Sequence, residues 1–247
     1  MNNDSPKEIK LLKVLINDSY SEDCGLVNTF TIFKSINNIF YLIYPDRNSS
    51  IICYNLMEET KICHLKKAHK QYITNIKHCL DEKNYRDIIM SISHKDNNIK
   101  LWNFHNWECL SNIINVNNSG LLFSGSFLNY QNKKYIITSN LDWKHIPEPI
   151  KIFDFNGIKI KEINNSNNNT LFIDTFYDYK SSKIYIIASS ENYIKSYDYN
   201  DNKLYKIYYE SNNGNHKSFI LFLIYLFQNY LNNIYIVDLN ALKILYF

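Results

Sequence analysis

Short apolar segments with a strand-like alternation recur along the whole chain and are separated by polar turns. One five-residue pattern marks them: isoleucine at its first position, usually an aromatic residue at its fourth, and Asn or Asp at its fifth. Its five copies are residues 51–55, 99–103, 150–154, 194–198 and 234–238. Their fourth positions follow one another at intervals of 40 to 51 residues. Such a period, built from strand-forming residues, predicts an all-β protein made of repeated units.

The segments around each copy supply the other strands of a unit. Two apolar segments precede most copies, as residues 27–33 and 39–44 precede the first. A tight polar turn and a further alternating segment follow each copy. In the third unit that turn contains Asn156-Gly157. Because both residues tolerate positive φ, we expect a two-residue β-hairpin there, and four strands in each unit.

The second unit carries additional residues of a known repeat signature. Ala68-His69 precedes its strands, Asp96 lies at a turn, and Trp102-Asn103 ends the five-residue pattern. In these residues the chain resembles the WD40-repeat family of β-propellers, which has Gly-His, a turn aspartate and Trp-Asp at the corresponding places. The resemblance implies a ring of four-stranded blades.

The resemblance also implies a hydrogen-bonded network in the second unit. In such blades the aspartate, the histidine, a serine or threonine hydroxyl and the tryptophan indole are linked. The corresponding residues are His69, Asp96, Ser93 and Trp102, with Ser91 as the other candidate for the hydroxyl. A carboxylate at a buried turn needs donors, and a neighbouring imidazole and backbone N–H groups would provide them. We therefore expect these residues to be structural.

The resemblance covers about residues 25–247, after an N-terminal segment of residues 1–24. The expected blades are residues 25–66, 67–114, 119–163, 169–210 and 217–247. Residues 9–16 predict a lone strand in the N-terminal segment. Two arrangements stay open: a compact five-bladed ring with a degenerate last blade, or an incomplete, open ring. In the open ring the lone strand lacks partners, and an exposed blade edge favours self-association.

The composition of the chain limits the cellular compartments and the kinds of partner to be expected. The net charge is +3 and the only arginines are Arg47 and Arg86, which disfavours nucleic-acid binding through guanidinium groups. The five cysteines form no C-x-x-C pair, which favours reduced thiols in a cytoplasmic or nuclear protein. The N-terminal residues lack the apolar segment of a secretory signal, and the longest apolar run, residues 219–227, is too short for a transmembrane helix. Asn-rich stretches such as residues 164–169 are expected in solvated loops.

The sequence predicts no catalytic residue, cofactor or metal ion. His69, Asp96 and Ser93 have the residue types of a hydrolase triad, but the repeat already accounts for His69 and Asp96. The five glycines are spread along the chain, so they form no phosphate-binding loop. Five cysteine and histidine residues between positions 63 and 79 could in principle bind a metal ion, but their spacing matches no standard zinc site. Those residues are Cys63, His64, His69, His78 and Cys79.

The best candidate for partner binding is the long loop at residues 141–149. Pro147 and Pro149 stiffen it, and it carries an aromatic residue beside cationic ones, a composition typical of binding hot spots. Its candidate binding residues are Trp143, Lys144, His145 and Ile146, with Tyr72 as a weaker companion. In the alternative, Trp143 folds back and covers its own blade.

We therefore expect a WD40-like scaffold that is not an enzyme and that binds a protein or peptide partner through its loops. Two alternatives stay open. One is a propeller that handles a small ligand or a glycan, with or without enzymatic activity. The other is a lysine-based binder of nucleic acid or of a membrane surface.

Overall fold

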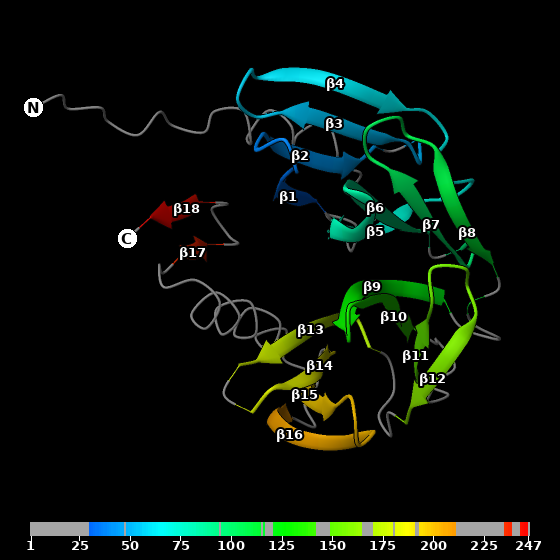
Figure 1. The fold of residues 1–247 in the computed structure, drawn as a ribbon, viewed down its shortest axis with the longest axis vertical. Helices are drawn as coiled ribbons and strands as arrows, with labels where there is room; N and C mark the ends of the chain where they lie inside the picture. The colour runs from blue at the N-terminus through cyan, green and yellow to red at the C-terminus, as the bar shows by residue number, and fades with distance from the viewer. Residues whose placement is uncertain are drawn as a thin grey trace, which may run out of the picture. The chain divides into compact units, whose positions relative to one another are not determined.

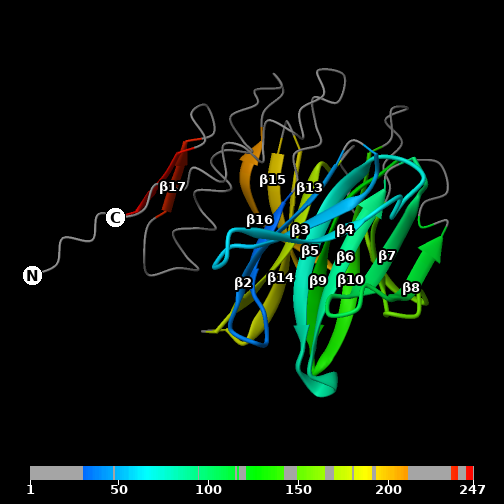
Figure 2. The ribbon, with the colours of Figure 1, turned by 90° about the horizontal axis from the view of Figure 1, so that it is seen from above.

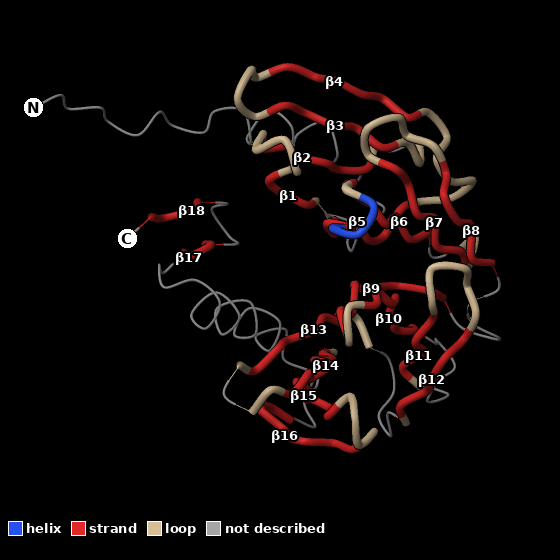
Figure 3. The backbone as a smooth tube through the Cα atoms, viewed as in Figure 1, coloured by secondary structure: helices blue, strands red, loops and turns tan. Residues whose placement is uncertain are grey.

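The protein is all-β, as the repeat predicts (Figure 1). The structure, a computed structural model, describes residues 30–46, 48–93, 95–114, 116, 121–141, 149–164, 170–179, 181–190, 193–210, 235–238 and 243–246. In this part of the chain the strands form four sheets of four strands and one sheet of two. A single turn of 3₁₀ helix, η1 (Glu82–Asn84), lies between two strands and is coloured blue in Figure 3.

Each four-stranded sheet is built from strands that are consecutive in the sequence and antiparallel where the pairing is described. The first contains β1 (Thr31–Lys34), β2 (Phe40–Pro45), β3 (Ile51–Asn55) and β4 (Thr60–Leu65). The second contains β5 (Ile73–Asp81), β6 (Arg86–Ser93), β7 (Asn98–Asn103) and β8 (Cys109–Ile114). The third contains β9 (Leu121–Tyr130), β10 (Lys133–Leu141), β11 (Ile150–Phe153) and β12 (Lys159–Ile163). The fourth contains β13 (Phe172–Asp178), β14 (Lys183–Ser189), β15 (Tyr193–Asp198) and β16 (Lys203–Glu210).

The chain divides into two compact units. The first comprises residues 1–123 with residues 155–157, and it contains the sheets β1–β4 and β5–β8. In this unit β5, β6 and β7 lie side by side (Figure 1 and Figure 2). The second comprises residues 124–154 and 158–247, and it contains most of the sheet β9–β12 and all of β13–β16.

The first four copies of the five-residue pattern occupy equivalent places, because each forms the third strand of its sheet. The fourth-position residue pairs with an apolar residue of the second strand in every sheet. These pairs are Tyr54 with Leu42, Trp102 with Ile89, Phe153 with Ile136, and Tyr197 with Ile186. In each four-stranded sheet the pairing with the fourth strand also shifts register between the third and fourth positions, as it does between Leu101 and Trp102. Such a bulge adds twist to the outer strand at the same point of each unit.

The Asn or Asp at the fifth position caps the turn that follows. Its side-chain Oδ1 accepts a hydrogen bond from a backbone N–H in or at the end of that turn. In three sheets the donor lies two residues further on, which is the geometry of an Asx turn, and for Asp154 it lies four residues further on. These bonds run from Met57 to Asn55 (2.9 Å), from His105 to Asn103 (3.1 Å), from Ile158 to Asp154 (2.8 Å) and from Asn200 to Asp198 (2.8 Å). A small side chain with an acceptor oxygen is therefore required at this position, which explains why only Asn and Asp occur there.

The turn at Asn156-Gly157 differs from the expected two-residue hairpin. Of this pair only Gly157 has positive φ, at 86°. The backbone N–H of Asp154 donates to the carbonyl of Ile158 at 2.9 Å, so residues 155–157 form a three-residue loop. In the other three sheets, a residue with positive φ likewise ends the turn before the fourth strand. These residues are Glu59, Trp107 and Asn202.

Apolar residues of the strands form a core within each unit. In the first unit one apolar cluster includes Ile51, Ile73 and Trp102. In the second it includes Ile150 and Tyr197. The isoleucines at the first position of the four copies are each no more than 4% exposed. Because full burial of one such side chain stabilises a fold by about 1.5–3 kcal/mol, these positions tolerate little change.

The fifth copy of the pattern lies only partly within the described residues. Its strand, β17 (Tyr235–Asp238), pairs with β18 (Lys243–Tyr246), and Asp238 is opposite Lys243 just as Asp198 is opposite Lys203. Residues 9–16, expected to form a lone strand, and residues 217–234 of the expected last blade lie outside the described residues. In the part of the chain that is described, no helix has the length and apolar character needed to cross a membrane.

Candidate functional site

The expected binding residues fall into two groups. Trp143, Lys144, His145 and Ile146 lie outside the described residues, so their role stays a prediction. Tyr72 is described: it lies immediately before β5 and is 39% exposed. It ends the segment that connects β4 to β5, residues 66–72, which we call the β4–β5 loop. This loop is the best-defined candidate site, and it lies entirely within the first unit.

Two backbone hydrogen bonds attach the β4–β5 loop to the turn between β2 and β3. The N–H of Lys67 donates to Ser50 Oγ at 3.2 Å, and the N–H of His69 donates to the carbonyl of Ser49 at 3.1 Å. Both serines are buried. Lys67 has a φ of 51°, which lets the chain reverse direction at this point. The loop is therefore fixed to the first sheet before it enters the second.

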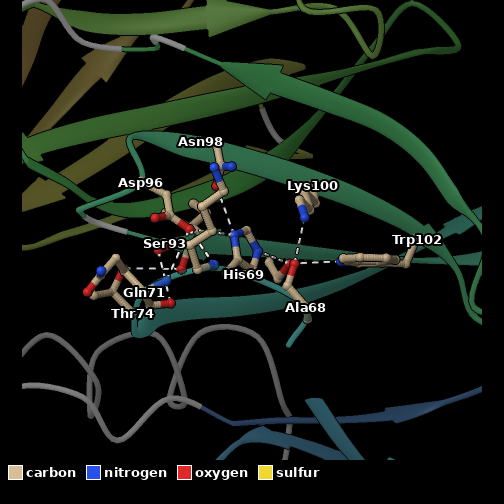
Figure 4. Close-up of polar contacts among 12 residues, drawn as sticks. Ala68, His69, Gln71, Thr74, Ser93, Asp96, Asn98, Lys100 and Trp102 are labelled. Atoms are coloured by element: carbon tan, nitrogen blue, oxygen red, sulfur yellow. Dashed lines mark hydrogen bonds and ion pairs between the residues drawn. The ribbon is translucent and has the colours of Figure 1, made fainter. Parts of the chain in front are cut away.

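The side chain of His69 attaches the same loop to the second sheet (Figure 4). Its ring is buried, and it contacts residues of two strands. His69 Nδ1 lies 2.8 Å from Asn98 Oδ1, and Nε2 lies 2.7 Å from Ser91 Oγ. The indole N–H of Trp102 donates to the same Ser91 oxygen at 2.8 Å. We call His69, Ser91, Asn98 and Trp102 the His69 network.

Burial keeps the imidazole of His69 neutral. Its pKa is lowered from 6.5 to about 4, first because burial disfavours the charged ring and second because the Lys100 ammonium group lies nearby. A neutral ring carries one N–H, and the amide oxygen of Asn98 beside Nδ1 places the proton there. Nε2 is then the acceptor for the Ser91 hydroxyl, whose oxygen in turn accepts from Trp102. Every polar atom in this chain of bonds has a partner of the right kind.

The carboxylate of Asp96 holds the backbone of the β4–β5 loop. Its Oδ2 accepts hydrogen bonds from the N–H groups of Lys70 at 2.7 Å and of Gln71 at 3.2 Å. The imidazole contributes less than expected, because His69 Nδ1 lies 3.9 Å from this oxygen and is closer to Asn98. The turn aspartate therefore acts mainly as an acceptor for two consecutive backbone donors.

Of the two candidate serines, Ser91 carries the hydroxyl that is bonded to both His69 and Trp102. Ser93 Oγ instead donates to the carbonyl of Gln71 at 3.2 Å. Both serines are fully buried on β6. Ser91 is opposite Lys100 in the register, which brings it diagonally next to Trp102, whereas Ser93 is opposite Asn98. Ser93 thus also supports the β4–β5 loop, but from the end of the strand.

Lys100 of β7 also attaches the loop to the second sheet, in addition to His69 and Asp96. Its ammonium group donates to the carbonyl of Ala68 at 2.6 Å and lies 5.5 Å from the centre of the Trp102 ring. The carbonyl therefore has a charged donor, and the indole face is in the range of a cation–π contact. Lys100 accordingly stabilises the loop rather than extending into solvent.

The geometry of the network does not suit nucleophilic catalysis. The Ser91 hydroxyl lies within hydrogen-bond distance of the His69 imidazole, but Ser91 is 0% exposed. Its oxygen is also occupied by the indole N–H of Trp102. An attacking serine must reach a substrate carbonyl, and this one is enclosed by its own sheet. The network is structural.

The residues considered for a zinc site are engaged separately. His78 Nε2 lies 2.7 Å from Asp87 Oδ1, His64 Nε2 lies 3.2 Å from Asp46 Oδ2, and His69 belongs to its network. Within the described ranges, no group of three or more His, Cys, Asp and Glu residues is close enough together to hold a metal ion.

The outer surface of the β4–β5 loop is cationic. Three exposed lysines precede Tyr72 in this loop, and the neighbouring β6–β7 turn carries one more exposed lysine. These lysines are Lys66, Lys67, Lys70 and Lys95. Asp96 is the carboxylate that faces the loop, and its Oδ2 is occupied by backbone donors. The site therefore combines a rigid backbone, a partly exposed aromatic ring and several positive charges.

Two contributors to the site, Asn98 and Lys100, are missed by the sequence analysis, which leaves Ser91 as one of two candidates for the hydroxyl. A signal for them exists in the alternation of the strands. Asn98, Lys100 and Trp102 are two residues apart on β7 and so lie on one face of the sheet. Residues directly opposite each other on paired strands share a face, which adds Ser91 and Ser93 of β6. Tracing this face from Trp102 would have identified the network.

Comparison of the chain with models of known protein families and with curated proteins finds no match.

Proposed function

We propose that this chain is a WD40-like β-propeller that acts as a non-enzymatic scaffold and binds a partner protein through the β4–β5 loop. The observation that carries the proposal is the way the loop is held. Three buried or half-buried side chains, those of His69, Asp96 and Lys100, fix its backbone. Its lysines and Tyr72 remain exposed. A loop that is already ordered loses little conformational entropy on binding.

The propeller part of the proposal rests on the repeated sheets. Four sheets share one strand order, one bulge position and one turn-capping residue, as expected of blades. Whether the blades close into a ring or leave an open edge that self-associates is a separate part of the proposal. We place the protein in the cytoplasm or nucleus, because its described cysteines are free and two of them are buried.

The chemistry of the loop favours an acidic protein surface as the partner. Several ammonium groups within one short segment attract carboxylates, and a tyrosine supplies apolar contact area together with a hydroxyl group. Lysines give less geometric selectivity than arginines for planar phosphate or carboxylate groups, so the aromatic ring would provide much of the specificity. The loop at residues 141–149 with Trp143 stays a second predicted contact of the same scaffold.

The experiment is affinity capture with matched surface variants of the full chain. Tyr72→Ala and Lys70→Glu change the β4–β5 loop. Tyr85→Ala and Lys83→Glu are the controls, because both residues are exposed in the turn at the opposite end of β5. We expect the two loop variants to reduce partner capture by about tenfold or more, the effect of losing a hot-spot contact of about 1.4 kcal/mol or more.

The outcome separates the proposed function from its alternatives. Equal losses in the loop and control variants, or no loss in either, would reject the β4–β5 loop as the binding site. Binding of duplex DNA or anionic vesicles that is lost in Lys70→Glu and falls steeply with salt, without a captured protein, would instead identify a charged-surface binder. Urea unfolding of each variant checks that the fold is unchanged.

A further inference from the structure

Two cysteines lie opposite each other in the first sheet. Cys53 of β3 and Cys63 of β4 are direct partners in the register of the antiparallel pair. Direct partners in such a pair have Cα atoms about 4.5 or 5.5 Å apart, and both distances fall in the range of about 4.4–6.8 Å that a disulfide spans. Side chains of direct partners also point to the same face of the sheet. Consistent with this, both cysteines belong to one apolar cluster.

The two thiols differ in access to solvent. Cys53 is fully buried, whereas Cys63 is half-buried on β4, the outer strand of its sheet. Burial raises the pKa of both thiols, and most strongly that of Cys53. For Cys63 the backbone N–H of Leu65 and the ammonium group of Lys61 oppose this effect by stabilising the thiolate. A reagent in solution therefore meets Cys63 first.

We propose that Cys53 and Cys63 are a redox modification site that forms a reversible cross-strand disulfide by exchange with a low-molecular-weight disulfide. The Cys63 thiolate attacks one sulfur of the reagent, which forms a mixed disulfide and releases one thiolate. The Cys53 thiolate then attacks the Cys63 sulfur, which forms the bond between the two strands and releases the second. Both cysteine sulfurs are oxidised, the reagent is reduced to two thiols, and these take up the two protons lost by the cysteines.

The other described cysteines are opposite residues other than cysteine in the register. Cys79 is opposite Ile88, and Cys109 is opposite Trp102. Cys109 is exposed, so it can form a mixed disulfide with a reagent but has no cysteine across the strand. The inference goes beyond the proposed partner binding, because it concerns the thiols of β3 and β4 and needs no partner.

The disulfide would join β4 to β3 and close a loop that contains the turn at Met57. A cross-link of this kind restricts the unfolded chain, so the oxidised protein should unfold at a higher temperature. Because strained or accessible disulfides between neighbouring strands are reduced readily, the bond should also open again with dithiothreitol. The pair thus provides a reversible clamp on an edge strand.

Peptide mapping of the full, folded chain tests the inference. The reduced protein is incubated with oxidised glutathione, blocked at its free thiols and digested with trypsin without reductant. Cleavage after Arg47, Lys61 and Lys66 places the two cysteines in separate peptides, residues 48–61 and 62–66. We expect these peptides to be joined by a disulfide that dithiothreitol removes, with glutathione on Cys109 as the internal proof that the reagent was active.

Two variants and one outcome in the native protein make the test decisive. In Cys63→Ser, Cys53 should stay a free thiol and the rise in melting temperature should vanish. In Cys53→Ser, Cys63 should stop at the glutathione adduct. A stable adduct on Cys63 with Cys53 still free in the wild-type chain would overturn the inference. So would linkage that appears only in urea, or a Cys109 adduct with both partners unmodified. Circular dichroism checks that each variant is folded. If Cys53→Ser, the substitution at the buried position, unfolds the chain, the result with Cys63→Ser is used by itself.

Discussion

Replacement of Ser91 by Ala removes one oxygen atom and affects two buried groups at once. The indole N–H of Trp102 loses its acceptor, and Nε2 of His69 loses its donor. Ser91 is 0% exposed, so water has no ready access to either group. Each buried polar group left unpaired costs about 1–3 kcal/mol, so Ser91→Ala, which leaves two, should lower the free energy of unfolding by about 2–6 kcal/mol.

Ser93→Ala is the matched control, because it makes the same chemical change two residues along the same buried strand. Ser93 donates one bond of 3.2 Å to the carbonyl of Gln71, a residue that is exposed. Water can replace that donor, so we expect a loss of only about 0.5–1.5 kcal/mol. The contrast between the variants therefore isolates the position of Ser91 in the network from the general cost of removing a buried hydroxyl.

Urea unfolding followed by tryptophan fluorescence measures the difference. With Trp143 replaced by Phe in all samples, the emission comes from Trp102 and Trp107, which belong to the second sheet and its last turn. For a slope of about 2 kcal/mol per molar urea, the Ser91→Ala midpoint should fall by about 1–3 M. An equal or larger effect of Ser93→Ala would refute the assignment of the network.

Two further effects can be measured in the same way. The pKa of His69 is lowered to about 4 in the folded chain. The contribution of the neutral His69 ring to the free energy of unfolding is therefore complete above pH 6.5. It is lost as the pH falls towards 4, by about 3 kcal/mol in total. If the free energy of unfolding of His69→Gln had the same pH dependence as that of the wild-type chain, this assignment would be contradicted. Asn55→Ala removes the acceptor of two turn N–H groups, those of Met57 and Glu58, and should lower stability by about 1–2 kcal/mol, whereas Asn55→Asp should retain most of it; equal urea midpoints for the two variants would disprove the capping role.

The strands and their grouping were largely predictable from the sequence, because they depend on local patterns. The alternation and the period of the repeat predicted all-β units of four strands, and four such sheets are present. The Asn or Asp at the fifth position was recognisable as part of the repeat, although its role as a turn cap needed the hydrogen bonds to become clear. Properties set by neighbouring residues in the chain are thus visible in the sequence.

Features that depend on register across strands were harder to predict. The sequence leaves Ser91 and Ser93 as candidates for the hydroxyl of the network, and the pairing of β6 with β7 is what places Ser91 next to Trp102. Similarly, Asn156-Gly157 forms a longer loop than expected because the bulge before Phe153 changes where the paired residues end. A turn motif indicates a reversal of the chain, but it does not determine which residues pair beside it.

The His69 network is one chemical solution to a task that recurs in other sheets. In three of the four sheets, the residue immediately before the copy of the pattern holds a segment that connects two sheets. In the second sheet it is Asn98, bonded to His69, and in the fourth it is Tyr193, whose hydroxyl lies 2.8 Å from Thr170 Oγ1. In the first sheet it is Ser50, which accepts a bond from the loop to the next sheet. Any buried donor–acceptor pair can hold the connecting segment next to the start of the third strand without leaving a polar group unpaired. The position is therefore kept by geometry while its residue type varies, which is why a polar signature is complete in one sheet and yet the same fold persists in the others.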